Sequence, residues 1–476
     1  MPELKGVKFT RPDYDYALTD WSLIGDVCEG ERAIKDARER YLPRPNPFDT
    51  SKQNSDRYDS YLARSVFYNA TGHTLRGMIG AIFRKEPETD LPAQIEYANE
   101  DVSGSGVSLG QQSQAVTKEV LGKGRHGLWV DHPTTQSASI ADQQSGSVRA
   151  NIISIDASRI TNWQTTSVGG RLKLSLVVIK EQSDSVAEDG FTKLSSKQYR
   201  VLRLVESVYQ IEIWRPTTSE AEKFELAEVF VPTMGNGSTW GEIPFVFVGA
   251  NNNDPDIDHP PMLDLATLNI AHYRNSADYE DSAFFCGQAQ PWMSGLTEDW
   301  AKMLEKKGLF VGSRNPIPLP EGGAFGIAQA QPNTLVKEAM DSKERQMVAL
   351  GARLLEKGGA VKTATQSQSE SESEHSVLSL VAENVSNAYQ KCLTWCAEFM
   401  NASGEVVFDL NTDFANYLLD SQMITALIQA WQSGNLPASD LWSQFRRAGL
   451  IDNEKDDEAI KEELSSEDSG LELDEE

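Results

Sequence analysis

The chain of 476 residues carries 71 acidic and 44 basic side chains, a formal net charge of −27. Hydrophobic residues make up 39%, and with 34 glycines this is a globular composition that excludes a wholly disordered chain. The acidic balance excludes an ordinary sequence-blind DNA-binding protein, whose surface would be basic. At roughly 150 residues per domain, the length is that of about three domains or one large one.

The N-terminus (MPELK) lacks the apolar core of a signal peptide, and no run of about 18 apolar residues occurs along the chain. We therefore expect no cleavable signal and no membrane span. Of the four cysteines, only Cys392 and Cys396 are close in sequence. A spacing of four on a helix favours packing over a disulfide or a zinc site, so a reducing compartment is expected.

The first elements along the chain are predicted to be helices. Residues 1–45 are predicted to form a polar helix, which ends at the prolines of the segment 43–47. A long helical stretch at 56–84 is expected to break near Gly72, and another helix covers about 107–121 before a short strand at 128–130.

Between 150 and 250 the apolar period becomes that of strands, with Gly, Pro and Asn between the segments. An antiparallel sheet of four or five strands is predicted, built from 172–179, 199–204, 209–214 and 243–248.

After residue 261 the pattern is strongly helical. Helices at 262–286 and 333–357, each roughly 37 Å long at 1.5 Å per residue, would form a hairpin with an irregular insert at its tip. A polar loop, an amphipathic helix at 374–399, a strand at 405–410 and helices at 419–432 and 438–448 follow. The last 25 residues hold 13 acids and two lysines, so disorder is expected beyond about Ser465.

Three segments with possible chemistry have simpler interpretations. Residues 122–127 spell G-x-G-x-x-G, but a helix precedes the glycines and a strand follows, the reverse of the dinucleotide-binding order. A tight helix-to-strand turn is therefore expected. The acidic segment 254–259 could coordinate a hard cation, although its Pro and Asn neighbours favour a solvated loop. Glu370, Glu372 and Glu374 alternate with serines, which is typical of a flexible acidic loop. We predict no catalytic residue, no metal ligand and no cofactor, and a structural protein rather than an enzyme.

The order of elements resembles the portal proteins of tailed bacteriophages, the head-to-tail connectors, and most closely an uncharacterised portal-like phage structural family. The segments that carry the resemblance are 41–44 (YLPR), 61–71 (YLARSVFYNAT), 77–80 (GMIG), 83–85 (FRK), 127–131 (GLWVD), 260–278 and 434–439 (GNLPAS). It covers about residues 40–450, and the order of elements carries it more than any one motif.

The resemblance implies an α+β, portal-type fold with an α/β wing, two long stem helices, a small α/β clip, a long amphipathic wing helix and a helical crown. Mapped onto this chain, the parts are the wing at 1–261, stem helix 1 at 262–286, the clip at 287–332, stem helix 2 at 333–357, the channel (tunnel) loop at 358–372, the wing's long helix and strand at 373–410, and the crown with its acidic tail at 411–476.

The resemblance also implies a function: a ring, probably of twelve copies, at one capsid vertex, through which double-stranded DNA is packaged and ejected without sequence specificity. Its partners would be the terminase large subunit, a head–tail adaptor or tail protein, and the major capsid protein, with no membrane. The location would be the virion, and the host cytoplasm during assembly. The alternative is a phage nucleic-acid-processing enzyme that uses acidic-loop metal ligands.

Two sets of candidate residues follow from this mapping. Those expected to face DNA in the channel are Lys337, Lys343, Arg345, Lys357, Lys362, Thr363, Gln366 and Gln368. Each basic residue among them could equally form a solvated or intersubunit ion pair. Those expected to dock the motor or adaptor, or to be buried between subunits in the clip, are Trp292, Trp300, Phe310, Ile317, Leu319 and Phe325.

Overall fold

The computed structural model describes residues 5–132, 149–217, 220–288, 290–307, 319–328, 334–355, 377–412, 428–433, 436–447, 451 and 455–468. The chain divides into two compact units, residues 1–412 and 413–476. Helices and strands are mixed along the chain, which confirms the expected α+β class. Within the described residues, no helix combines the length and the apolar character that a membrane span requires.

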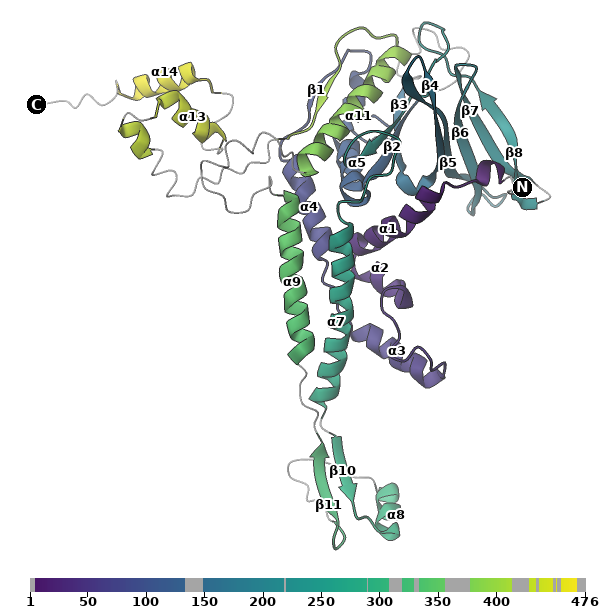
Figure 1. Ribbon diagram of the computed structural model, residues 1–476, viewed down its shortest axis with the longest axis vertical. Helices are drawn as coiled ribbons and strands as arrows, with labels where there is room; N and C mark the ends of the chain where they lie inside the picture. Colours follow the sequence, from purple (N-terminus) through teal and green to yellow (C-terminus); the bar gives the residue numbers. More distant parts are fainter. Residues whose placement is uncertain are drawn as a thin grey trace, which may run out of the picture. The chain divides into compact units, whose positions relative to one another are not determined.

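A three-stranded antiparallel sheet lies at the core of the first unit. Its order is β3 (Asn151–Asp156), β2 (Arg125–Asp131) and β9 (Phe245–Gly249). The preceding helix α5 (Leu109–Lys123) begins with a capping box, in which the Ser108 and Gln111 side chains each bond the other's backbone. The long helix α11 (Val377–Phe399) packs against this sheet and α5 (Figure 1). The sheet is therefore covered by helices, and β9 is buried along its whole length.

Helix α11 has the amphipathic pattern predicted for it and buries fifteen of its 23 residues. Cys392 and Cys396 are both free and buried. Burial raises the pKa of both thiols, which stay protonated and act as packing groups, as their spacing predicts.

A second, five-stranded antiparallel sheet runs in simple chain order (Figure 1). Its strands are β4 (Ile160–Val168), β5 (Arg171–Val186), β6 (Lys193–Val205), β7 (Val208–Thr217) and β8 (Glu220–Phe230). The prediction that 243–248 belongs to this sheet is wrong, because that segment is β9 and pairs with β2 through Leu128 and Val246. A local apolar pattern identifies a strand but not its long-range partner.

The N-terminal region is helical. It contains α1 (Pro12–Glu29), α2 (Glu31–Asp36), α3 (Lys52–Arg64) and α4 (Ala70–Ile82). The predicted break near Gly72 is wrong, since the chain leaves helical geometry at 65–69 and Gly72 lies in the first turn of α4. The Asn69 side chain caps α4 by accepting from the Gly72 amide at 2.8 Å. A Cβ at Gly72 would lie 2.6 Å from Asn69 Oδ1, so this cap requires glycine.

The remaining elements of the first unit are short helices, one small strand pair and a helical hairpin with an insert. The 3₁₀ helices are η1 (Gly6–Lys8), η2 (Arg38–Arg40), η3 (Glu96–Asn99) and η4 (Ala157–Arg159), and β1 (Glu88–Asp90) pairs with β12 (Val407–Asp409). The hairpin and its insert are α7 (Leu263–Gly287), β10 (Gln290–Ser294), α8 (Glu298–Lys307), β11 (Ala324–Ala328) and α9 (Thr334–Leu355).

The second unit contains α13 (Ala438–Arg447), where a helix was predicted, and α14 (Asp457–Asp468). Helix α14 continues to Asp468, so residues 466–468, where disorder was expected, are helical, and the residues after 468 lie outside the described part of the chain. Asp456 accepts from the Ala459 amide at 2.7 Å, and Lys455 pairs with Glu463 at 2.8 Å, so the start of α14 is fixed. The helix predicted at 419–432 lies largely outside the described residues.

Candidate functional site

Helices α7 and α9 pack side by side at the positions predicted for the two long helices (Figure 1). The buried face of α7 occupies its first four turns, from Leu265 to Ala277. Beyond that point its apolar side chains are exposed, with Phe284 at 47% and Phe285 at 69%. On α9, Met347 is buried while its neighbour Val348 is 72% exposed. The pair therefore presents apolar side chains outward along much of its length.

Asn269, in the buried face of α7, holds the segment 61–71 against this helix. Its Oδ1 accepts from the backbone N–H of Thr71 at 3.1 Å and from the Thr71 hydroxyl at 3.0 Å. Its Nδ2 donates to the Tyr68 carbonyl at 2.7 Å. Asn269 itself is fully buried, and so are its two bonds to Thr71, while its bond to Tyr68 is half-buried. The sequence signal, an amide within an apolar stripe, was present at Asn269 but was not singled out.

A second set of contacts continues this attachment along α7. The Tyr61 hydroxyl donates to Asp278 at 2.6 Å, and Arg64 pairs with Asp281 at 2.6 Å. The Arg64 guanidinium also lies 4.1 Å from the centre of the Phe284 ring. Burial and the hydrogen bond to Asp278 raise the pKa of Tyr61, so the phenol keeps its proton and remains a donor. Two segments about 200 residues apart in sequence thus form one rigid base for the helix pair.

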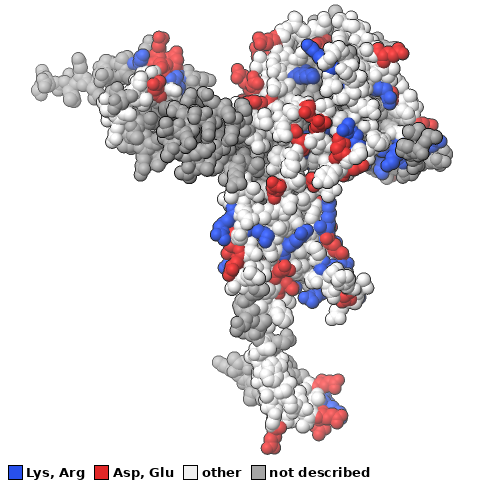
Figure 2. Space-filling view, viewed as in Figure 1, with Lys and Arg blue, Asp and Glu red and all other residues white. Residues whose placement is uncertain are grey.

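The three predicted channel residues that the structure describes lie on α9. The Lys343 ammonium donates to Asn275 Oδ1 of α7 at 2.6 Å, so it lies between the two helices. Lys337 and Arg345 are exposed, and Arg345 Nε donates to the Asp341 carbonyl at 3.2 Å. Acidic and basic side chains are interspersed on the visible face of the helix pair (Figure 2). The predicted residues that lie outside the described part of the chain are Lys357, Lys362, Thr363, Gln366, Gln368, Phe310 and Ile317.

The insert between α7 and α9, hereafter the tip module (β10, α8 and β11), is a small hairpin with one helix. Trp292 of β10 lies opposite Gly326 of β11, where a Cβ would be only 2.6 Å from the indole. The indole therefore covers the glycine but remains 46% exposed. Trp300, Leu319 and Phe325 are half-buried, and no described residue of the tip module is fully buried. The module lacks a core of its own in the described residues.

The G-x-G-x-x-G segment is the helix-to-strand turn that its order predicts. Gly124 ends α5 with φ +73°, and a Cβ there would lie 3.0 Å from the Asp258 carbonyl. A Cβ at Gly127 would lie 2.7 Å from both Ile160 and Phe245. The glycines thus serve close packing between the turn, the acidic loop and the sheet.

Arg125 of this turn organises the acidic loop 254–259. Its buried guanidinium donates to the carbonyls of Pro255 at 3.0 Å and Asp256 at 2.6 Å. It lies 3.8 Å from the centre of the Phe247 ring, and burial lowers the pKa of Arg125 to about 9. The Asp258 carboxylate accepts from the Asn251 amide at 2.8 Å. Across the described ranges, no group of three or more His, Cys, Asp or Glu side chains could hold a metal ion, so no observation there favours a metal-dependent nucleic-acid-processing enzyme.

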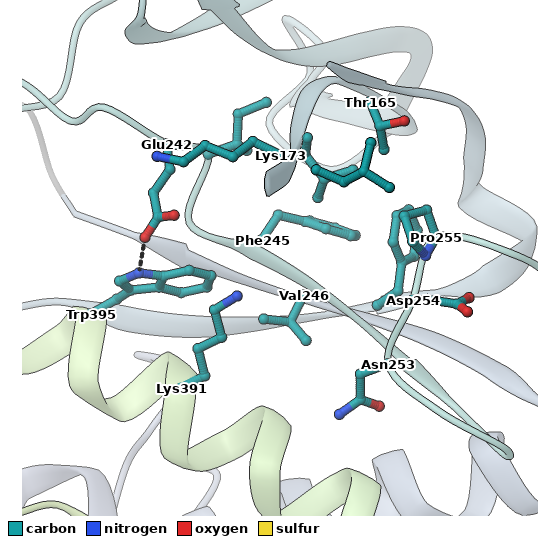
Figure 3. Close-up of a pocket in the computed structure, with 14 residues that line it drawn as sticks. Thr165, Lys173, Glu242, Phe245, Val246, Asn253, Asp254, Pro255, Lys391 and Trp395 are labelled. Atoms are coloured by element: carbon teal, nitrogen blue, oxygen red, sulfur yellow. Dashed lines mark hydrogen bonds between the residues drawn. The ribbon is translucent and has the colours of Figure 1, made fainter. Parts of the chain in front are cut away.

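A cavity of about 340 Å³, hereafter the lysine pocket, lies between the two sheets and α11 (Figure 3). Trp395 forms part of its wall and donates to Glu242 at 3.0 Å. The Lys391 ammonium lies 4.9 Å from the centre of the Trp395 ring, and Lys173 donates to the Gly241 carbonyl at 3.5 Å. Sequence reasoning missed this pocket because its wall comes from β4, β5, β9 and α11, which only the tertiary structure brings together.

Comparison with known proteins gives one family and several structures. A family model described as Domain of unknown function (DUF4055) matches residues 261–400, which contain the helix pair, the tip module and α11. No curated protein sequence matches the chain significantly. The virion of a native gene transfer agent (GTA) particle contains a chain similar to this one, with a TM-score of 0.41 and 13% identity over 82% of this chain and 91% of that chain.

Chains in the necks of gene transfer agent particles are similar to the same degree. The neck of the empty particle, computed with C6 symmetry, gives a TM-score of 0.39 and 14% identity over 78% of this chain and 88% of that chain. The neck of the native particle, computed with C12 symmetry, gives a TM-score of 0.39 and 12% identity over 79% of this chain and 89% of that chain. At these scores the likeness carries no functional conclusion, and we base the proposed function on the chain's own residues.

Proposed function

We propose that this protein is a portal-type head–tail connector of a phage-like particle, in which copies of the chain assemble into a ring around a DNA channel. The observation that carries this proposal is that the helix pair and the tip module leave apolar side chains exposed. Leu335, Val348 and Phe285 are each more than two-thirds exposed on long helices. Apolar side chains ordered on a rigid scaffold but not covered by their own chain are typical of a surface that packs against other chains.

The charge of the helix pair suits a conduit for DNA. The segments that form α7 and α9 contain seven acidic and five basic residues. A strongly basic lining would bind the phosphate backbone tightly, because each neutralised phosphate adds to affinity. A mixed lining lets the duplex slide, with Lys337 and Arg345 available for transient phosphate contacts. In this proposal the segment 358–372 forms the channel loop, and the chain has no enzymatic activity of its own.

The tip module supplies the docking surface in this proposal. Its half-buried Trp300 and Phe325 and its exposed Trp292 are covered by neighbouring subunits, by the packaging ATPase (terminase large subunit) during filling, and by a head–tail adaptor or tail protein afterwards. The wing side contacts the major capsid protein at one vertex of the virion, after assembly in the host cytoplasm.

The mass of the purified full-length chain tests the proposal. A ring of twelve chains of 52.7 kDa has a mass of about 0.6 MDa, which sedimentation and negative-stain images distinguish from a monomer or dimer. Deleting 290–330 is expected to abolish the ring and to leave a folded, smaller species. A chain that remains monomeric or dimeric at all concentrations would contradict the proposal.

A further inference from the structure

The hairpin of β5 and β6 projects beyond the rest of its sheet. Strand β4 pairs with β5 only as far as Ile179, and β7 pairs with β6 only from Tyr199 onward. Within the described residues, the stretch 180–198 is thus a two-stranded arm whose strands pair only with each other. A two-stranded hairpin is marginally stable in water by itself. This arm is therefore expected to gain support from a surface outside its own sheet.

The tip of the arm presents an aromatic ring close to two acidic groups. Phe191 is 95% exposed, and Glu188 and Asp189 beside it are exposed as well. The turn is fixed, because the Asp189 carboxylate accepts from the backbone N–H groups of Phe191 at 2.9 Å and Thr192 at 2.8 Å. Gly190, with φ +74°, completes it. The ring is held outward by a defined turn, which lowers the entropy cost of docking it.

The lysine pocket has the complementary chemistry. Phe245, Val246 and Trp395 provide apolar walls, and Lys391 and Lys173 supply two ammonium groups (Figure 3). Neither ammonium pairs with a carboxylate of the described residues, and Lys391 is exposed. The two acids of the lining are Glu242, which accepts from the Trp395 indole, and Asp254, which accepts from the Asp256 amide at 2.8 Å, and among the described residues neither forms an ion pair with Lys391 or Lys173. An aromatic group flanked by carboxylates fits this pocket.

The tip of the same chain cannot reach the pocket. The pocket is lined by Leu172, Lys173 and Leu174 at the start of β5, whereas the tip follows Val186 at the end of that strand. At about 3.3 Å per residue, the paired strand separates the two by roughly 45 Å. The occupant must come from a second molecule.

We propose that the arm of one copy inserts Phe191 into the lysine pocket of a second copy, with Glu188 and Asp189 against Lys391 and Lys173. Tip and pocket are different surfaces, so the contact is heterologous, and such contacts repeat around a ring when the rotation closes. The inference deepens the proposed function and rests on its self-assembly. The contact would be the lateral link between neighbouring wings.

A two-component crosslinking experiment tests this contact directly. One preparation carries Thr165→Cys at the pocket, and the other, distinguished by a size tag, carries Thr192→Cys at an exposed position beside Phe191, which leaves the ring and both acids in place. Both are full-length and contain Cys28→Ser and Cys286→Ser, while the buried Cys392 and Cys396 remain. A short bis-maleimide is expected to join the two preparations into a covalent heterodimer. The matched control is Phe48→Cys, which is 94% exposed on a different surface and is expected to give at least fivefold less product.

Charge reversal gives the second part of the test. Lys391→Glu on the Thr165→Cys chain is expected to reduce the heterodimer about tenfold, and Glu188→Lys on the Thr192→Cys chain is expected to restore much of it. Both residues are exposed, so neither change should unfold the chain. Rescue by the double change requires that the two side chains meet, which a merely structural role would not produce.

The outcomes separate this inference from the proposed function. A ring of about 0.6 MDa whose cysteine pair yields no more heterodimer than the Phe48→Cys control would overturn the arm–pocket contact and leave the ring intact. Specific crosslinking with charge rescue in a chain that never exceeds a dimer would support the contact and contradict the ring. Unchanged crosslinking in Lys391→Glu would overturn the pairing of charges that defines the contact.

Discussion

The sheet around β2 and the helix pair α7–α9 are both regular, yet they obtain their stability differently. Helix α11 buries fifteen of 23 residues and packs against β2, β9, α5 and β12. In α9, Met347 and Gly351 are the buried residues among those whose side chains are described. Helices are stabilised mainly by packing of an apolar face, so the first region is complete within one chain, whereas in the proposed ring the second is completed by contacts with other copies. Substitutions in the first should lower the free energy of unfolding, and substitutions in the second should weaken assembly.

The largest expected effect is that of Phe247→Ala in the first region. Phe247 is 2% exposed and contacts Trp163, Phe245 and the Arg125 guanidinium. Its loss leaves a cavity and uncovers a buried cation, so the free energy of unfolding should fall by about 3–5 kcal/mol. Urea denaturation of the dilute chain measures this. A loss under ~1 kcal/mol would show that the sheet core is not what holds the first unit together.

Acid should destabilise the same region through His126, which is 3% exposed. Burial lowers the pKa of His126 to about 4, against roughly 6.5 in an unfolded chain. Between these values the unfolded chain binds a proton that the folded chain does not, so stability falls as the pH is lowered from 6.5 towards 4. The expected loss is about 3 kcal/mol, and His126→Gln should flatten this dependence. An unchanged pH profile in that variant would assign the acid sensitivity to other groups.

The attachment of α7 to the segment 61–71 is tested by Asn269→Ala. The change leaves the Thr71 hydroxyl and amide and the Tyr68 carbonyl without their partner in a buried site, which should cost about 2–3 kcal/mol. The matched control is Asn275→Ala on the same helix, whose side chain accepts only from the half-exposed Lys343 and should cost under ~1 kcal/mol. Equal losses in a urea titration would mean that Asn269 has no special role in anchoring α7.

The smallest expected effect on unfolding comes from Trp292→Ala in the tip module. Because the side chain is 46% exposed, the free energy of unfolding of the dilute chain should change by no more than ~1 kcal/mol. Sedimentation of the concentrated protein should nevertheless show weaker assembly, since the indole is proposed to lie between subunits. A variant that is strongly destabilised but assembles normally would reverse the comparison between the two regions.

Local patterns predicted most elements, and the errors have physical causes. Helix α11 and the turn at Gly124 can be predicted because each depends on a pattern of residues that are close in sequence. The break before α4 lies at 65–69 rather than at Gly72, because Asn69 caps the helix and the glycine makes room for the cap. For the candidate site residues Lys343 and Trp292, the sequence predicts the element that carries each residue but not what its side chain contacts.

The sequence by itself determined the α+β class, the paired long helices with an insert, and the acidic balance that disfavours a tight DNA clamp, because periodicity and charge are local properties. Only the tertiary structure decided that β9 leaves the meander to pair with β2, that Asn269 joins α7 to the segment 61–71, and that Lys173 and Lys391 face one pocket. These features join residues that are from about 120 to more than 200 positions apart. No local pattern specifies such pairings, which are selected by burial and hydrogen bonding in the folded chain.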